Sequence, residues 1–128
     1  MRYLLLISTL TTSLLFSAAS WAEWTFITQS VDENKVYLDI DRIQKNGGYV
    51  YVWSLVDYIK PDKWGDMSAK RYYEVDRKAL RYKPLTNIYY KEPMGEGSGE
   101  SSRFHSPEWV SPSPNSIIES MLNTVCAQ

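Results

Sequence analysis

Hydrophobic and polar residues alternate along most of the chain beyond residue 23, and this period of two predicts β-strands. In segment 35–44, for example, Val36, Leu38 and Ile40 share one parity. Segment 49–59 is hydrophobic on both parities, which predicts a strand covered on both faces at the centre of its sheet. Strands are predicted at residues 24–30, 35–44, 49–59, 68–77, 79–90 and, as a short last strand, 103–110.

Turn and loop residues separate these strands. The run Lys-Asn-Gly-Gly at 45–48 is typical of a tight hairpin, because Asn-Gly supplies the positive φ angles that such turns require. Pro84 has no N–H to donate to a β-ladder, so its strand is expected to lie at an edge or to carry a bulge. Residues 31–34 are predicted to be a turn, and residues 60–66 and 95–102 are predicted to be loops.

Near the C-terminus the period of the hydrophobic pattern changes to that of a helix. Ser116 and Glu119 have capping-box spacing, and Ser113 followed by Pro114 is the alternative start. A run of antiparallel strands followed by one amphipathic helix predicts an α+β domain with the helix laid on the sheet. The hydrophobic face of this helix comprises Ile117, Ile118, Met121, Leu122 and Val125.

The first 22 residues have the pattern of a bacterial secretory signal peptide. Arg2 precedes a hydrophobic run, and Ser-Trp-Ala at 20–22 fits the small-x-small rule for cleavage. A membrane anchor is disfavoured, because the stretch 3–16 is shorter than the ~20 residues that a span needs. No cysteine follows the run, so a lipoprotein is not expected. We therefore expect residues 23–128 to form a single exported domain that is periplasmic, secreted or associated with the outer surface.

Composition narrows the class of partner. The formal net charge of the chain is −1, and nothing in this balance calls for nucleic acid or an anionic membrane. No second hydrophobic segment of spanning length follows the signal peptide, so no transmembrane segment is expected in the mature chain. Cys126 is the only cysteine, although small exported domains usually carry cysteines in pairs.

Candidate metal ligands are sparse in the sequence. His105 is the only histidine, and Pro107 interrupts any helix that would align it with Glu108. Asp39 and Asp41 would point to one face of a strand near its expected bend. They would suit a divalent cation, but a strand end or charge pairing is the simpler interpretation. No metal or cofactor is therefore expected.

Catalytic patterns are equally weak. The glycine-rich segment 95–99 lacks the Gly-Lys-Ser/Thr of a phosphate-binding loop. No serine has a histidine in a recognisable motif beside it. Cys126 faces the negative end of the helix dipole, which disfavours its thiolate. We therefore predict that the protein is not an enzyme.

Basic residues cluster on two neighbouring predicted strands. If these strands pair, several of the charges share a face and could bind an acidic polymer or protein. A solvated sheet face is the simpler interpretation. The cluster comprises Lys70, Arg71, Arg77, Lys78, Arg81 and Lys83.

Taken in order along the chain, several short motifs resemble the bacterial surface-adhesin protein E family. They are "WTFITQS", "VYLDIDRIQKNGGYVYVWSLVDY", "SAKRYYEVDRKALRY", "MGEGS" and "EWVSPSPNSIIESMLNTVC". Each motif alone is weak, but their order covers nearly the whole mature chain. The resemblance implies a sheet of about six antiparallel strands with the C-terminal helix held against one face.

The resemblance also implies exposure at the bacterial surface and binding of a protein partner from the host extracellular matrix or serum. We expect the basic cluster to bind together with the exposed aromatic residues Trp64, Tyr72 and Tyr89. The alternative hypothesis is a periplasmic accessory module that binds a small apolar ligand or an envelope protein between sheet and helix. Structural roles are expected for Trp53, Ile118, Leu122 and Cys126.

The resemblance gives the single cysteine a meaning. Relatives of this type generally pair the helix cysteine with one that follows the acidic residue of the "EVD" strand, where this chain has Arg77. Cys126 then is one half of a disulfide whose partner is absent. Linking two chains into a homodimer is the alternative role for this thiol.

Overall fold

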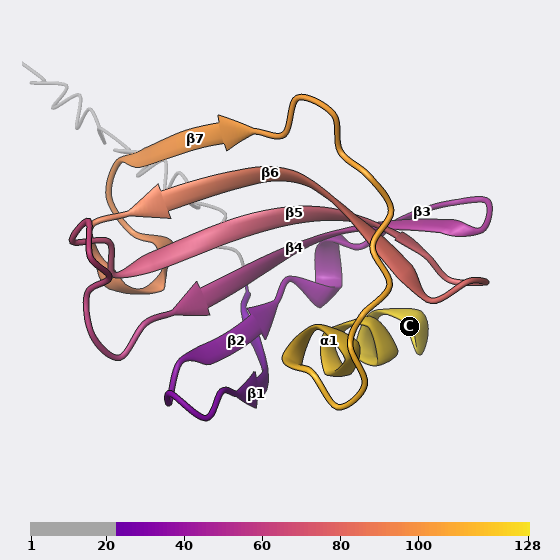
Figure 1. Cartoon of the computed structure of the whole chain (residues 1–128), viewed down its shortest axis with the longest axis horizontal. Coiled ribbons are helices and arrows are strands. Elements are labelled where there is room, and N and C mark those ends of the chain that lie inside the picture. Colours follow the sequence, from indigo (N-terminus) through magenta and orange to yellow (C-terminus); the bar gives the residue numbers. More distant parts are fainter. Residues whose placement is uncertain (1–22) are drawn as a thin grey trace, which may run out of the picture.

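Backbone hydrogen bonds join seven antiparallel strands into one sheet in the computed structural model, which describes residues 23–128 (Figure 1). The predicted signal peptide, residues 1–22, lies outside the described residues. The strand order is β1-β2-β4-β5-β6-β7, and β3 also pairs with β4. The strands are β1 (Thr25–Gln29), β2 (Lys35–Leu38), β3 (Gln44–Asn46), β4 (Tyr49–Asp57), β5 (Ser68–Asp76), β6 (Arg81–Tyr90) and β7 (Gly99–Arg103).

Strand β4 lies inside the sheet, as its doubly hydrophobic pattern predicted. It pairs with β2 and β3 on one side and with β5 on the other. Val50 and Leu55 project to opposite faces and are both fully buried. The predicted hairpin precedes it: Asn46 pairs with Tyr49 across a two-residue turn, in which Gly47 has a φ of 62°.

Helix α1 (Ile117–Cys126) packs on one face of the sheet, and in the view of Figure 1 it lies beside the β1–β2 hairpin and below β4. The Ser116 hydroxyl accepts a hydrogen bond from Glu119 N at 3.1 Å, so Ser116 is the N-cap and Ser113 is not. The Glu119 carboxylate in turn accepts from Asn115 N at 3.2 Å. Both bonds satisfy amide groups that would otherwise lack partners at the start of the helix.

The hydrophobic core lies between this helix and the sheet. Most of its members are fully or almost fully buried, and together with the capped helix they confirm the predicted α+β class. The core comprises Val36, Leu38, Val50, Val52, Tyr73, Val75, Met121, Leu122 and Val125.

Two predicted strands are different in the structure. Segment 35–44 is interrupted by a 3₁₀ turn, η1 (Ile40–Arg42), which separates β2 from β3. The prediction of a loop at 95–102 and a strand at 103–110 was wrong in position along the chain, because the last strand is β7, Gly99–Arg103. Of the later segment, Arg103 ends β7, Phe104 N donates a 3.3 Å hydrogen bond to Leu85 O, and Val110 pairs with the sheet through a bridge to Tyr82.

Pro84 marks a bulge inside the sheet and not an edge strand. Strand β6 pairs with β5 and with β7, but Tyr72 faces Thr86 while Tyr73 faces Pro84. One additional residue, Leu85, is therefore accommodated on β6. Even-numbered residues of β6 therefore point to one face of the sheet before the bulge and to the opposite face after it.

Among residues 23–128, no helix has both the length and the hydrophobicity needed to cross a membrane.

Candidate functional site

The sheet has one face packed against helix α1 and one face that the helix does not cover, here called the open face. Pairing of β4, β5 and the first half of β6 brings side chains of alternate residues together on the open face. They comprise Tyr49, Tyr51 and Trp53 from β4, Lys70, Tyr72 and Glu74 from β5, and Arg81 and Lys83 from β6.

Aromatic rings form the centre of the open face. Trp53 stacks on Tyr72 with ring centroids 4.7 Å apart, and Tyr51 lies 6.1 Å from the same tyrosine ring. Tyr49, which is 42% exposed, stacks on Trp109 at 5.8 Å. Rings in these arrangements offer a rigid, amphipathic surface at little cost in conformational entropy.

Two cations flank Trp109. The guanidinium of Arg81 lies 4.6 Å from the Trp109 ring centroid, and the ammonium of Lys83 lies 4.5 Å from it. Trp109 reaches this position because the neighbouring Val110 pairs with Tyr82 at the edge of β6. Cation–π contacts of this kind favour both the position of the ring and the position of the charges.

Carboxylates orient the same cations from the sheet side. Arg81 Nε lies 3.0 Å from Asp76 Oδ2, and Lys83 Nζ lies 3.8 Å from Glu74 Oε1. Glu74 also accepts a 2.6 Å hydrogen bond from the Tyr51 hydroxyl, and this bond raises the pKa of Tyr51. The open face is thus a preorganised network of aromatic rings and paired charges.

The structure divides the predicted basic cluster among three places. Lys70, Arg81 and Lys83 lie on the open face. Arg71 points to the face that carries the helix, where it lines two cavities with Tyr73. Arg77 and Lys78 are exposed in the turn between β5 and β6.

The predicted aromatic residues are also dispersed. Tyr72 lies on the open face, whereas Tyr89 lies on the helix-bearing face because of the bulge in β6. Trp64 is 68% exposed in the loop between β4 and β5, at the far end of the sheet from Arg81. Trp109 belongs to the site but was not among the predicted contact residues, because no local pattern links it to β4 or β6.

Of the residues with expected structural roles, three lie in or against the core. Leu122 is fully buried, and Ile118 and Cys126 pack against the core while half-buried. Trp53 lies instead on the open face, where it stacks on Tyr72.

The two aspartates of the D-x-D motif do not share a strand face. Asp39 precedes the 3₁₀ turn and is only 3% exposed, whereas Asp41 lies within the turn and is exposed. Burial raises the pKa of Asp39, and Arg42 Nε lies 3.7 Å from its carboxylate. Within residues 23–128, no group of three or more histidine, cysteine, aspartate or glutamate side chains is arranged to hold a metal ion.

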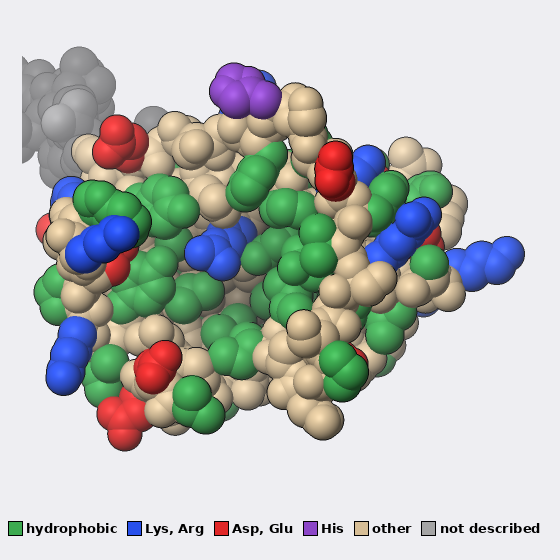
Figure 2. Space-filling view, viewed as in Figure 1, with side chains coloured by type: hydrophobic (Ala, Val, Ile, Leu, Met, Phe, Trp, Pro, Cys, Tyr) green, Lys and Arg blue, Asp and Glu red, His purple; other side chains and the backbone are tan. Residues whose placement is uncertain are grey.

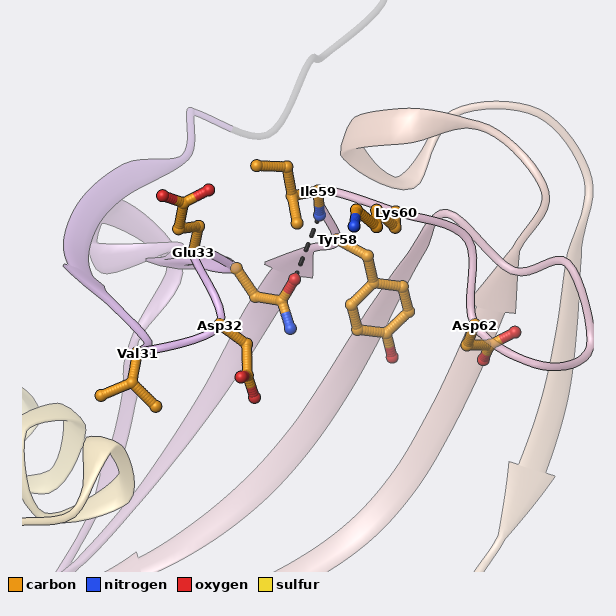
Figure 3. A pocket seen from close by; sticks show the side chains of 8 residues that line it. Val31, Asp32, Glu33, Tyr58, Ile59, Lys60 and Asp62 are labelled. Carbon is orange, nitrogen blue, oxygen red and sulfur yellow. Dashed lines mark hydrogen bonds between the residues drawn. The ribbon is translucent and has the colours of Figure 1, made fainter.

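A surface hollow of about 650 Å³ lies between the β1–β2 turn and the segment after β4 (Figure 3). Asp32 and Glu33 point in different directions from that turn, and Tyr58 and Asp62 lie across from it. The Asn34 amide oxygen already accepts a 3.1 Å hydrogen bond from Ile59 N. This hollow has one aromatic residue in its lining, Tyr58, and lacks the stacked rings that the open face offers for recognition.

Comparison with known proteins gives a consistent family assignment. A family model described as surface-adhesin protein E matches residues 24–127. No curated protein sequence matches the chain.

Solved structures of protein E from Haemophilus influenzae share the fold. Crystal form II aligns with a TM-score of 0.63 and 17% identity over 80% of this chain and 87% of that chain. The structure from a non-typeable strain aligns with a TM-score of 0.62 and 15% identity over 86% of this chain and 79% of that chain. At these identities the similarity establishes the fold.

Proposed function

Because the chain belongs to the surface-adhesin protein E family, we propose that it is an exported, non-catalytic domain that binds a protein of the host extracellular matrix or serum. The observation that carries the proposal is the open face, where Trp109 stacks on Tyr49 and contacts the cations of Arg81 and Lys83. Aromatic residues and arginine contribute most of the binding energy at protein interfaces.

The charges of the open face favour a partner with an acidic segment. Each cation near Trp109 is already paired with a carboxylate, so it is held in place before a partner arrives. An incoming carboxylate can approach Arg81 and Lys83 from the solvent side, while its neighbours contact the rings. Such complementarity raises the rate of association and makes it sensitive to salt.

The test is surface plasmon resonance against a panel of immobilised matrix and serum proteins. Trp109→Ala is expected to weaken binding about tenfold or more, as for a central interface aromatic. Lys83→Glu is expected to slow association most strongly at low salt.

Matched controls lie at the far end of the sheet. Trp64→Ala removes an exposed tryptophan and Lys60→Glu reverses an exposed charge, both in the β4–β5 loop. Neither is expected to change affinity. Equal losses from Trp64→Ala and Trp109→Ala, or binding to no protein of the panel, would contradict the proposal.

The alternative function, a periplasmic module that binds a small apolar ligand, has one observation in its favour: cavities lie beside helix α1. Protease treatment of intact cells separates the two functions. Digestion from outside supports display at the surface, and full protection supports a periplasmic location.

A further inference from the structure

Helix α1 leaves part of its own face of the sheet uncovered, over β5 and β6, and the surface is hollowed there (Figure 2). Two cavities of about 300 and 260 Å³ both include Arg71, Tyr73 and Ile118 in their walls, so they form one groove, here called the helix-side groove. In the space-filling view, basic side-chain atoms lie in a hollow ringed by hydrophobic side chains, and Arg71 is the basic residue lining both cavities.

Arg71 has no carboxylate partner among the described residues. The ion pairs of residues 23–128 involve Arg42, Arg81, Lys83 and Lys91. The Nε atom of Arg71 is buried and has no hydrogen-bond acceptor. The residue as a whole is half-buried and lines both cavities, and a half-buried guanidinium without a counter-charge is unfavourable.

The guanidinium also keeps its charge. Burial alone would lower the pKa of Arg71, but its pKa is raised, because interactions with Tyr73, which include a hydrogen bond, and with Tyr58 and Tyr89 more than offset burial. Tyrosine hydroxyls are neutral at physiological pH, so they solvate the cation without neutralising it. The groove therefore presents an uncompensated positive charge at its floor.

The walls of the first lobe are mainly apolar, although Ser30, Asn34 and Ser54 also line it, and the walls of the second lobe are apolar and polar in similar measure. Val36, Val56 and Ile117 line one lobe, and Pro84 and Phe104 line the other. The Asn87 amide lies beside Arg71 across the β5–β6 pair, and its Oδ1 is also buried without a partner. The acidic residue of the lining is Asp32, at the turn end of the first lobe.

We propose that the helix-side groove binds a terminal carboxylate carried by an apolar chain, with Arg71 pairing with the carboxylate and the lobes enclosing the chain. A guanidinium matches the two oxygens of a carboxylate geometrically, and one cation balances its single charge. A free alkyl acid and the C-terminus of an apolar peptide share this chemistry. This site is separate from the open face, so the inference does not depend on adhesion.

The experiment is isothermal titration calorimetry on the mature chain. One arm compares sodium decanoate, below its micellar concentration, with 1-decanol. The other arm compares an acetylated tetrapeptide of alanine and leucine bearing a free C-terminal carboxylate with its C-terminal amide. Saturable binding of at least one carboxylate, tenfold or more tighter than its neutral analogue, is expected. The arm with the tighter binding identifies the source of the ligand.

Three variants locate the site. Arg71→Gln is expected to weaken carboxylate binding tenfold or more and to abolish the preference over the neutral analogue. Phe104→Ala removes a ring that is 42% exposed and is expected to weaken binding severalfold without threatening the fold. Lys60→Gln, which removes an exposed cation of the β4–β5 loop outside the groove, is the control and is expected to leave binding unchanged.

Several results would overturn the proposal. They are binding of neither carboxylate, equal binding of acid and neutral analogue, or full carboxylate affinity in Phe104→Ala. These comparisons hold even if Arg71→Gln fails to fold. Because the carboxylate assay uses no host protein, its failure is distinguishable from failure of the adhesive function.

Discussion

At the scale of single residues, Asp76 joins the open face to the turn that follows β5. Its Oδ1 accepts hydrogen bonds from Lys78 N at 3.1 Å and Ala79 N at 3.2 Å, and its Oδ2 accepts one from Arg81 Nε at 3.0 Å. The backbone bond from Ala79, followed by the contacts of Arg81 and Lys78, lowers the pKa of Asp76. The same carboxylate thus orders a turn and holds a cation of the open face.

This lowered pKa predicts a pH dependence of stability. A carboxyl whose folded pKa is depressed stabilises the fold above its ordinary pKa of about 4, and this contribution is lost as the pH falls through the folded value. Asp76→Ala is therefore expected to lower Tm by a few degrees at pH 7, with the difference from wild type shrinking below about pH 4. Thermal unfolding, monitored by circular dichroism at each pH, measures this difference in Tm.

The control is Asp41→Ala, which removes an exposed aspartate of the 3₁₀ turn and is expected to leave Tm at pH 7 unchanged. A Tm difference for Asp76→Ala that stays constant from pH 7 to pH 2 would mean that the charge of Asp76 does not stabilise the fold.

At the scale of elements, helix α1 is attached to the sheet by packing and by few polar contacts. Arg77 Nη2 donates a 3.4 Å hydrogen bond to the carbonyl of Cys126, across 49 positions of sequence, and Lys45 Nζ donates to the carbonyl of Gln128. Burial is the main cause of the raised pKa of the Cys126 thiol. The helix end therefore carries a half-buried thiol whose thiolate is disfavoured, and it lies near residue 77, the position at which the resemblance implies a cysteine partner.

The placement of this helix predicts that a disulfide can be introduced. Arg77→Cys is expected to form an intrachain bond with Cys126 under oxidising conditions, and the closed loop would stabilise the fold by about 4 kcal/mol in the chain-entropy model. Thiol titration measures formation of the bond, and Tm with and without reductant measures the stabilisation. The control combines Arg77→Cys with Cys126→Ser.

Two free thiols that persist in oxidised Arg77→Cys would show that the strand and the helix end are not bridgeable. A Tm gain that survives full reduction would have some other cause.

The sequence predicted those elements whose residues pack on a core. The period of two located β4 and β5, and the change of period with its cap located α1, because buried side chains impose these patterns. It missed β7, since Gly-Glu-Ser-Ser-Arg contains no hydrophobic residue and all five residues are exposed. Strand β7 pairs with β6 through its backbone alone, which leaves no hydrophobic signature.

At the scale of the whole molecule, one sheet separates two surfaces of different chemistry. The open face carries stacked aromatic rings and paired charges, and the other face carries the helix and the groove around Arg71. Adjacent residues of β5, Lys70 and Arg71, consequently serve opposite sides of the molecule.

The candidate site was only partly predictable from the sequence, because the pairing of the strands decides which side chains share a face. Simple alternation would place Tyr89 on the same face as Lys83, but the bulge at Leu85 moves Tyr89 to the helix-bearing side. Trp109 joins the site through the bridge between Val110 and Tyr82, a contact between distant segments that no local pattern encodes. Composition identified the types of residue that the site uses, and the three-dimensional pairing decided which of them meet.

The central claim, that the open face is the surface that binds a host protein, is tested most directly by hydroxyl-radical footprinting of the complex. The account predicts that oxidation of Trp109, Tyr49 and Tyr72 falls severalfold when a matrix or serum protein binds, while oxidation of the exposed Trp64 is unchanged. Protection of Trp64 with unchanged oxidation of the three open-face rings would contradict it.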